Sequence, residues 1–190
     1  LAHFRDRPVR EGGPREGGIC SRLLRHGPML AAATTIALAA AAKAETVTKI
    51  ETVSDWSLYA DGASPHKFCF VSSEPKSSDP ADTAREAPRA YISAWPKDGV
   101  KAEVSFRLGF PVKKGTEISA SVAPAGFQLF ANDDRAFVKD ATQELKLVEA
   151  MKKGSKLTLA SKTQTGVAVT DTYSLTGLGA ALQKLQETCF

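Results

Sequence analysis

The chain has 190 residues, of which 43% are apolar and 24% are charged, as in an ordinary globular protein. Its three cysteines exclude a small disulfide-dense scaffold and any metal site built from four cysteines. The formal net charge of +4 belongs to the first 44 residues, because seven of the 25 basic and three of the 21 acidic residues lie there. The rest of the chain is neutral, so we expect no nucleic-acid partner.

The amino-terminal segment has the three parts of a secretory signal. Residues 29–42 form an uncharged, Ala-rich run that comes after Arg22 and Arg25, and the small-residue pattern Ala42-Lys43-Ala44 closes the segment. The pattern predicts cleavage between Ala44 and Glu45, with an amino-terminal extension and signal peptide at 1–44 and one domain at 45–190. The run is shorter than the roughly 20 residues of a membrane helix. We therefore expect a periplasmic or extracellular protein without a stable membrane span after removal of the leader; an uncleaved Ala-rich helix is the alternative.

The mature chain has mostly strand signals. Alternating or β-rich runs recur about every ten residues and are separated by Gly-, Pro- and Asp-bearing turns, which indicates an antiparallel sandwich or barrel. Residues 73–89 are polar and contain several prolines, so we expect a loop there. The expected strands are 56–59, 67–72, 90–95, 100–110, 116–123, 127–130, 136–138, 156–161 and 167–175.

Two helices are expected late in the chain. Asp140, followed by Gln143, has the pattern of a capping box, and the helix that it begins is predicted to end before Gly154. We expect its buried positions to be Leu145, Val148 and Met151. A second helix is predicted at about 177–187, capped by Thr176, with an apolar stripe formed by Leu178, Leu182 and Leu185. The predicted fold is a mainly β, antiparallel sandwich-like or barrel-like single domain with one short inserted helix and a C-terminal helix.

Removal of the leader leaves two cysteines, Cys69 and Cys189. In an oxidising compartment an even pair favours one disulfide, which would join an early strand to the end of the chain. Two free buried thiols are the alternative.

Residues with catalytic potential are few. His66 is the only histidine after the leader, and it follows Ser64-Pro65, where a solvated turn residue is the simpler interpretation. Neither a serine-nucleophile motif nor a metal-binding spacing occurs, so we expect no catalytic residue, no cofactor and no metal. Trp56 and Trp95 could line a ligand cleft, but large aromatic residues of a small β domain more often belong to the core.

Several stretches together resemble one known family. The most specific are EAMKKGSKLTL, TDTYSLTGLGAAL and the cysteine next to the last residue. In this order and spacing, residues from about 56 to 189 resemble the invasion-associated locus B family of exported alphaproteobacterial proteins. The resemblance implies a compact β-sandwich-like domain with no established enzymatic activity. It also implies that Cys69 and Cys189 match the family's cysteine positions, while the cysteine that some members have after the Trp56 strand is missing.

The predicted function follows from export and from the lack of catalytic motifs. We expect an exported, non-catalytic module that interacts with an envelope or host protein. The alternative is a small-molecule-binding periplasmic protein with a cleft near the aromatic residues, which a pocket with convergent polar groups would favour.

Overall fold

A computed structural model describes residues 46–190, and the expected leader with its cleavage site between Ala44 and Glu45 lies outside the described residues. The described part contains one antiparallel sheet, in which the strands follow the order β1-β2-β3-β5-β6-β9-β8-β7-β10-β11-β4. The strands are β1 (Val47–Val53), β2 (Trp56–Asp61), β3 (Cys69–Ser73), β4 (Ser77–Asp79), β5 (Arg89–Trp95), β6 (Val100–Arg107), β7 (Ile118–Val122), β8 (Ala125–Asn132), β9 (Arg135–Val138), β10 (Lys156–Lys162) and β11 (Ala168–Ser174). The α-helices are α1 (Ala141–Lys153) and α2 (Leu178–Cys189), and a short 3-10 helix, η1 (Pro96–Asp98), connects β5 to β6. The predicted fold class is therefore confirmed.

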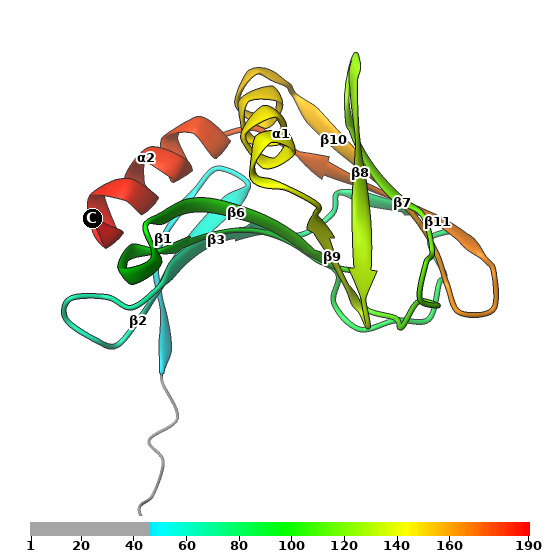
Figure 1. Cartoon of the computed structure of the whole chain (residues 1–190), viewed down its shortest axis with the longest axis horizontal. Coiled ribbons are helices and arrows are strands. Elements are labelled where there is room, and N and C mark those ends of the chain that lie inside the picture. The colour runs from blue at the N-terminus through cyan, green and yellow to red at the C-terminus, as the bar shows by residue number, and fades with distance from the viewer. Residues whose placement is uncertain (1–45) are drawn as a thin grey trace, which may run out of the picture. The chain divides into compact units, whose positions relative to one another are not determined.

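The sheet curls so that its inner face encloses the core. Strands β3 and β6 lie in one arm and β7, β10 and β11 in the other, and the two helices lie over the core (Figure 1). The ring centroids of Phe106 in β6 and Tyr173 in β11 are 5.9 Å apart, although these strands are not neighbours in the sheet. This contact between the arms gives the sandwich-like character that the strand spacing predicted.

Strand alternation decides which side chains enter the core. In β2 the inward residues are Trp56, Leu58 and Ala60, all without exposed surface. The indole nitrogen of Trp56 donates a hydrogen bond to the Ser174 carbonyl at 3.2 Å, so the polar atom of this buried ring is satisfied. The prediction that Trp56 belongs to the core is confirmed. Trp95 is only half-buried and, unlike its inward neighbour Ala94, points to the other face of the sheet.

Helix α1 begins as predicted but buries a different face. The Asp140 side chain accepts a hydrogen bond from the backbone N–H of Gln143 at 3.0 Å and so caps the helix. The predicted burial of Leu145 is wrong, since this side chain is 66% exposed; the buried residues are Leu147, Val148 and Met151. The short apolar pattern does not determine which side of the helix faces the core. Packing of α1 on the sheet buries Leu147 and leaves Leu145 exposed.

The ends of the two helices also differ from the prediction. Gly154 has an extended backbone, not a left-handed one. A Cβ atom there would lie 2.4 Å from a methyl of Val122, so close packing requires the glycine. Helix α2 is preceded by Gly177 in the left-handed conformation, with φ of 85°, and Thr176 does not cap it. Leu178 and Leu185 are buried and Leu182 is partly buried, as its stripe predicted.

The segment between β3 and β5, residues 74–88, is more ordered than the predicted loop. We call it the strap. It leaves β3, forms the short strand β4, and pairs antiparallel with β11 on the opposite arm through residues such as Ser78 and its partner Asp171. The strap thus links the two arms of the curled sheet. Its polar sequence does not indicate this long-range strand pairing.

Neither helix in the described part of the chain is long and apolar enough to cross a membrane.

Candidate functional site

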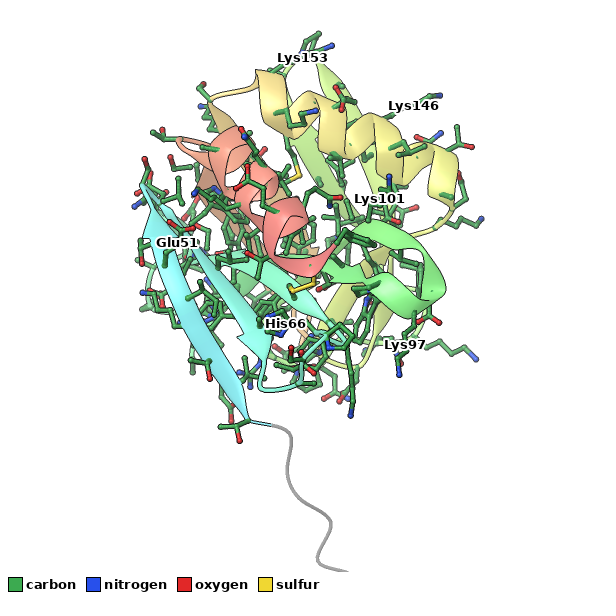
Figure 2. All side chains as sticks on the ribbon, turned by 90° about the vertical axis from the view of Figure 1, so that its left-hand side faces the viewer. Glu51, His66, Lys97, Lys101, Lys146 and Lys153 are labelled. Atoms are coloured by element: carbon green, nitrogen blue, oxygen red, sulfur yellow. A yellow bond between two sulfur atoms is a disulfide. The ribbon has the colours of Figure 1, made fainter. Side chains whose placement is uncertain are left out.

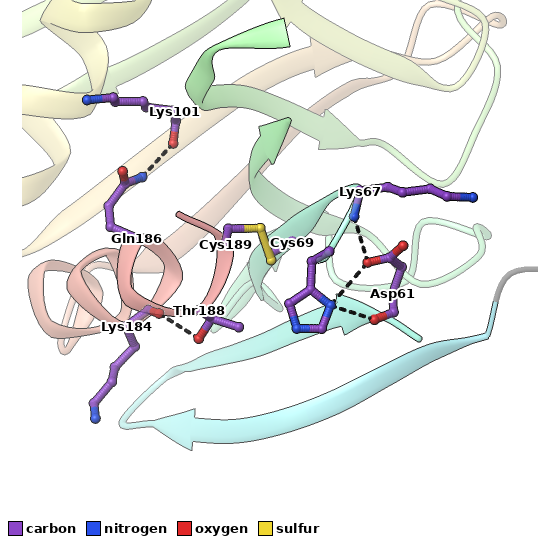
Figure 3. Close-up of a disulfide and its surroundings, with 9 residues drawn as sticks. Asp61, Lys67, Cys69, Lys101, Lys184, Gln186, Thr188 and Cys189 are labelled. Atoms are coloured by element: carbon purple, nitrogen blue, oxygen red, sulfur yellow. Dashed lines mark hydrogen bonds and ion pairs between the residues drawn. A yellow bond between two sulfur atoms is a disulfide. The ribbon is translucent and has the colours of Figure 1, made fainter. Parts of the chain in front are cut away.

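The disulfide joins Cys69 of β3 to Cys189, the last residue of α2, with their Cα atoms 6.1 Å apart (Figure 3). One turn earlier, the Gln186 side-chain amide donates a hydrogen bond to the Lys101 carbonyl at 2.9 Å. The end of α2 is therefore fastened to β3 covalently and to β6 by a hydrogen bond. Because Cys69 is fully buried and Cys189 nearly so, the bridge has a structural role.

His66 lies in the connection between β2 and β3 (Figure 2) and contacts Asp61. Its Nδ1 atom is 2.9 Å from the Asp61 carbonyl oxygen and 3.3 Å from Oδ1 of the same residue. The Asp61 side chain is 1% exposed and accepts a hydrogen bond from the backbone N–H of Lys67 at 3.0 Å. These contacts fix the connection between β2 and β3. Within residues 46–190 the hydrogen-bonding and ion-pair partner of His66 is Asp61.

The structure of the described residues holds no group of three or more His, Cys, Asp and Glu side chains that could ligate a metal. Asp133 and Asp134 lie in the turn between β8 and β9, and Asp134 forms an ion pair with Arg107 of β6 at 3.2 Å. The Asp134 carboxylate therefore ties this turn to β6.

A buried ion pair connects the strap to β11. Arg85 donates hydrogen bonds from its two terminal nitrogens to the two carboxylate oxygens of Asp171, at 2.8 and 2.5 Å. The Ser78 hydroxyl donates to the same carboxylate at 2.7 Å, and Arg85 also donates to the Leu108 carbonyl at 3.2 Å. The hydrogen bond to Asp171 raises the pKa of Arg85. With side-chain exposures of 6% and 0%, this pair is a structural clasp and not a ligand site.

Tyr173 lies beside this clasp in the core. Burial raises the pKa of its hydroxyl, and the nearby Asp171 carboxylate raises it further. Among the described residues its hydroxyl oxygen has no hydrogen-bond partner. The side chain is 1% exposed and lies within the core.

The outer face of β2, β3 and β5 carries an unusual set of side chains. Its outward residues are aromatic, hydroxyl-bearing or charged, whereas the inward residues of the same strands are apolar except for Ser73. Five half-buried aromatic residues, which we call the aromatic strip, are Tyr59, Phe68, Phe70, Tyr91 and Trp95. These half-buried rings do not cover the core, because the core lies on the other face of the sheet.

The rings of the aromatic strip contact one another across the three strands. The ring centroids of Trp95 and Phe68 are 5.3 Å apart, and those of Phe68 and Phe70 are 6.4 Å apart. Phe70 in turn lies 4.9 Å from Tyr59 and 5.8 Å from Tyr91. These distances are in the range of favourable ring pairs, so the strip is a continuous aromatic surface.

A cleft of about 480 Å³ adjoins the β10–β11 hairpin and another of about 350 Å³ lies between that hairpin and the strap, but neither contains a residue of the aromatic strip. A third cleft, of about 430 Å³, begins at Tyr59. We call it the polar cleft. The serine and threonine residues that line it are Thr52, Ser54, Ser57, Ser72 and Ser73. The predicted alternative of a cleft near aromatic residues thus has a counterpart at Tyr59, but Trp56 and Trp95 do not line it.

Charges around the polar cleft are mostly paired. Lys76 lies 2.5 Å from the Asp55 carboxylate, and its hydrogen bond lowers the pKa of Asp55. Arg89 pairs with Glu74. Lys49 also lines the cleft and forms no ion pair within the described part of the chain. The cleft is therefore close to neutral, with one cation in excess.

The sequence alone did not identify this surface. Alternation within the expected strand 67–72 puts Phe68 and Phe70 on one side and Cys69 and Val71 on the other, and of these four the structure buries only Cys69 and Val71. Aromatic residues recur at alternate positions of β2, β3 and β5, and this recurrence indicates that the outward faces of the three strands form one surface. It becomes visible only when the strand order and register are known, as in the direct pairing of Tyr59 with Phe70.

Comparison with known proteins identifies related sequences and a related fold. The family model described as "Invasion associated locus B (IalB) protein" matches residues 56–186. The chain is also similar to the crystal structure of invasion associated protein b from Bartonella henselae, with a TM-score of 0.52 and 21% sequence identity; the similarity covers 72% of this chain and 95% of that chain. At this identity the similarity establishes a shared fold. None of the curated proteins matches the chain.

Proposed function

The chain belongs to the invasion associated locus B family, and we propose that it is an exported, non-catalytic protein that recognises an envelope or host partner through the outer face of its sheet. The observation that carries this proposal is the aromatic strip. Five rings lie on a sheet face that has no covering layer among the described elements, because α1 and α2 pack over the core. Contiguous apolar surface that remains accessible on a folded domain is a mark of interaction sites, and aromatic residues are enriched at such sites.

Export is supported by two independent features. The residues before Glu45 have the charge, apolar run and small-residue pattern of a signal peptide. The disulfide between Cys69 and Cys189 is a bond that persists in oxidising compartments and is rare in the cytosol. Fractionation of cells that produce the full chain, followed by mass analysis of its amino terminus, tests this proposal. A mature protein beginning at Glu45 outside the cytosol is expected; a reduced, full-length protein in the cytosol would contradict export.

A non-catalytic role is supported by the chemistry of the described residues. The one histidine there is engaged with Asp61, and the most deeply buried charges form the clasp between Arg85 and Asp171. A clasp of paired charges supplies neither a free base nor a nucleophile.

The interaction surface can be tested in living cells. A photo-crosslinking amino acid placed at Ser93, between the rings of Tyr91 and Trp95 on β5, should yield a specific adduct. The double change Tyr91→Ala and Trp95→Ala should abolish that adduct, whereas Leu145→Ala, at an exposed apolar residue of α1, should leave it unchanged. An adduct that survives the loss of both rings would overturn the proposal.

Binding of a small ligand is the second candidate function. It is favoured by the polar cleft, in which hydroxyl groups and the Tyr59 ring converge. The two candidates are compatible, because the cleft and the aromatic strip share Tyr59.

A further inference from the structure

The polar cleft and the aromatic strip form one continuous surface. Tyr59 lines the cleft and also contacts Phe70 in the strip, with their ring centroids 4.9 Å apart and their planes inclined by 10°. From Tyr91 to Trp95 the strip extends along β5 by four residues, roughly 14 Å at the usual rise of a strand. A ligand that occupies both parts therefore has an extended shape.

This surface combines aromatic rings with hydroxyl-bearing residues. Rings and serine residues alternate along these strands: Ser57 pairs with Ser72, which is itself only 2% exposed, and Tyr59 pairs with Phe70, two positions further along. Ser72 also pairs with Tyr91, and Phe70 with Ser93, so the alternation continues onto β5. Outward aliphatic side chains are missing from these three strands, although an insertion surface for lipid or an apolar protein interface would favour them.

Saccharides have the complementary chemistry. A pyranose ring presents apolar C–H faces that pack on aromatic rings, and its hydroxyl edges donate to and accept from serine and threonine hydroxyls. The paired charges Lys76–Asp55 and Arg89–Glu74 leave only Lys49 in excess at the cleft. Such a nearly neutral surface fits an uncharged sugar or one that bears a single carboxylate.

We propose that the outer face binds a polysaccharide chain, with sugar units packed on the aromatic strip and hydroxyl groups held in the polar cleft. The inference rests on the proposed function, because it names the chemical class that the same surface recognises. Tyr59 has the central place, since it is the ring that belongs to both parts. Thr52 and Ser57, whose hydroxyl oxygens are 3.3 Å apart, supply hydrogen-bonding groups in the cleft.

Single-stranded nucleic acid is the rival ligand, because its bases also stack on aromatic sheet faces. Such sites need a cationic groove that follows the phosphates. Here Arg89 and Arg107 on the outer face already have the carboxylate partners Glu74 and Glu86. Arg135 lies 5.7 Å from the centroid of the Tyr91 ring, as a single cation at the border of the strip. The charge balance therefore favours the saccharide.

The test uses the oxidised mature protein purified from cells that express the full chain. An array of immobilised bacterial and host glycans, neutral and uronate-containing, identifies a binder, and titration with the corresponding soluble oligosaccharide gives the Kd. Tryptophan fluorescence reports the contact, because Trp95 is half-buried in the strip and Trp56 is enclosed in the core. Binding to the array, with a saturable fluorescence change, is the expected result.

Variants locate the site. Tyr59→Ala should raise the Kd at least tenfold. The change Leu145→Ala, at a 66% exposed side chain of α1, the helix that packs over the core and not over the outer face, should leave the Kd within twofold. Should Tyr59→Ala fail to fold, Thr52→Val combined with Ser57→Ala removes two hydroxyl groups from the cleft and should weaken binding to a similar extent.

Three outcomes would overturn the inference: no glycan bound on the array, binding unaffected by both sets of variants, or saturable binding of a single-stranded oligonucleotide at the same residues. These outcomes are separable from a failure of the proposed function. If the crosslinked adduct at Ser93 still depends on Tyr91 and Trp95 while no glycan binds, the interaction surface stands and only its ligand class is wrong.

Discussion

The guanidinium of Arg85 in the strap and the carboxylate of Asp171 in β11 form a buried two-pronged ion pair across 86 residues of sequence. Neither group has water as an alternative partner, since the two side chains are 6% and 0% exposed. Arg85 also lies against Phe110, 5.9 Å from its ring centroid. The pair therefore fixes where the strap crosses between the two arms of the sheet, and with it the position of β4.

Replacing only Arg85 or only Asp171 should lower the free energy of unfolding far more than replacing both residues together. Arg85→Met leaves an unpaired carboxylate in the core and should lower the free energy of unfolding by about 3–5 kcal/mol. Adding Asp171→Asn should restore part of this loss, which urea denaturation of the two single variants and the double variant will measure as a coupling energy. Arg107→Met, at an exposed ion pair with Glu86 and Asp134, is the control and should have little effect. Additive effects of Arg85→Met and Asp171→Asn would contradict the clasp.

The disulfide should contribute strongly to stability because it closes a long loop. It spans a sequence separation of 120 residues, for which the chain-entropy estimate is about 4–5 kcal/mol at most. Cys189→Ser should lower the thermal midpoint by several degrees, as should Cys69→Ser. The combination of both changes should be no worse than either alone, because each removes the same bond. A reducing agent should lower the midpoint of the wild type and leave that of the double variant unchanged. An unchanged midpoint of the wild type on reduction would mean that the bridge contributes nothing.

Two glycines at the start of α2 should respond in opposite directions to alanine. Gly177 has a φ of 85°, and a Cβ atom there would lie 2.6 Å from the Cβ of Ser54 and 2.7 Å from the Val53 carbonyl oxygen. Gly177→Ala should therefore destabilise the protein by at least about 1 kcal/mol. Gly179 lies inside the helix with open space around it, and Gly179→Ala should stabilise by up to about 1 kcal/mol. Thermal unfolding compares the two, and equal effects would contradict the assigned backbone conformations.

Glu144 should make stability fall as the pH rises. Burial raises the pKa of this carboxyl above its usual 4.5, although its carboxylate accepts a hydrogen bond from the backbone N–H of Val104 at 2.7 Å. Between pH 4.5 and the folded-state pKa, the folded protein holds more protons than the unfolded chain, so stability decreases as pH increases. Relative to the wild type, Glu144→Gln should gain stability across this window and hold that gain at neutral pH.

Glu149 is the matched control on the same helix. Its hydrogen bond with Lys152, at 2.8 Å, lowers its pKa, so its contribution is present above pH 4.5 and is lost as the pH falls. Denaturation curves of Glu149→Gln should therefore show the opposite trend relative to the wild type. Identical pH trends for the two glutamine variants would refute the assigned environments.

The sequence by itself determined the elements whose signals are local. Asp140 caps α1 because its side chain reaches a backbone N–H only three residues away. The period-two pattern of Phe68, Cys69, Phe70 and Val71 separates the two faces of β3 because successive strand residues point to opposite sides. The chain also has only two cysteines after the predicted leader, which restricted a disulfide to one pairing.

Only the tertiary structure decided the features that depend on distant partners. The strap is polar and contains prolines, so nothing local indicates that β4 pairs with β11 or that Arg85 is buried by Asp171. The candidate site is of the same kind: Tyr59, Phe70 and Tyr91 become neighbours through the order and register of three strands. Alternation tells which residues share a face of one strand, but the energy that selects the strand beside it comes from packing between segments far apart in the chain.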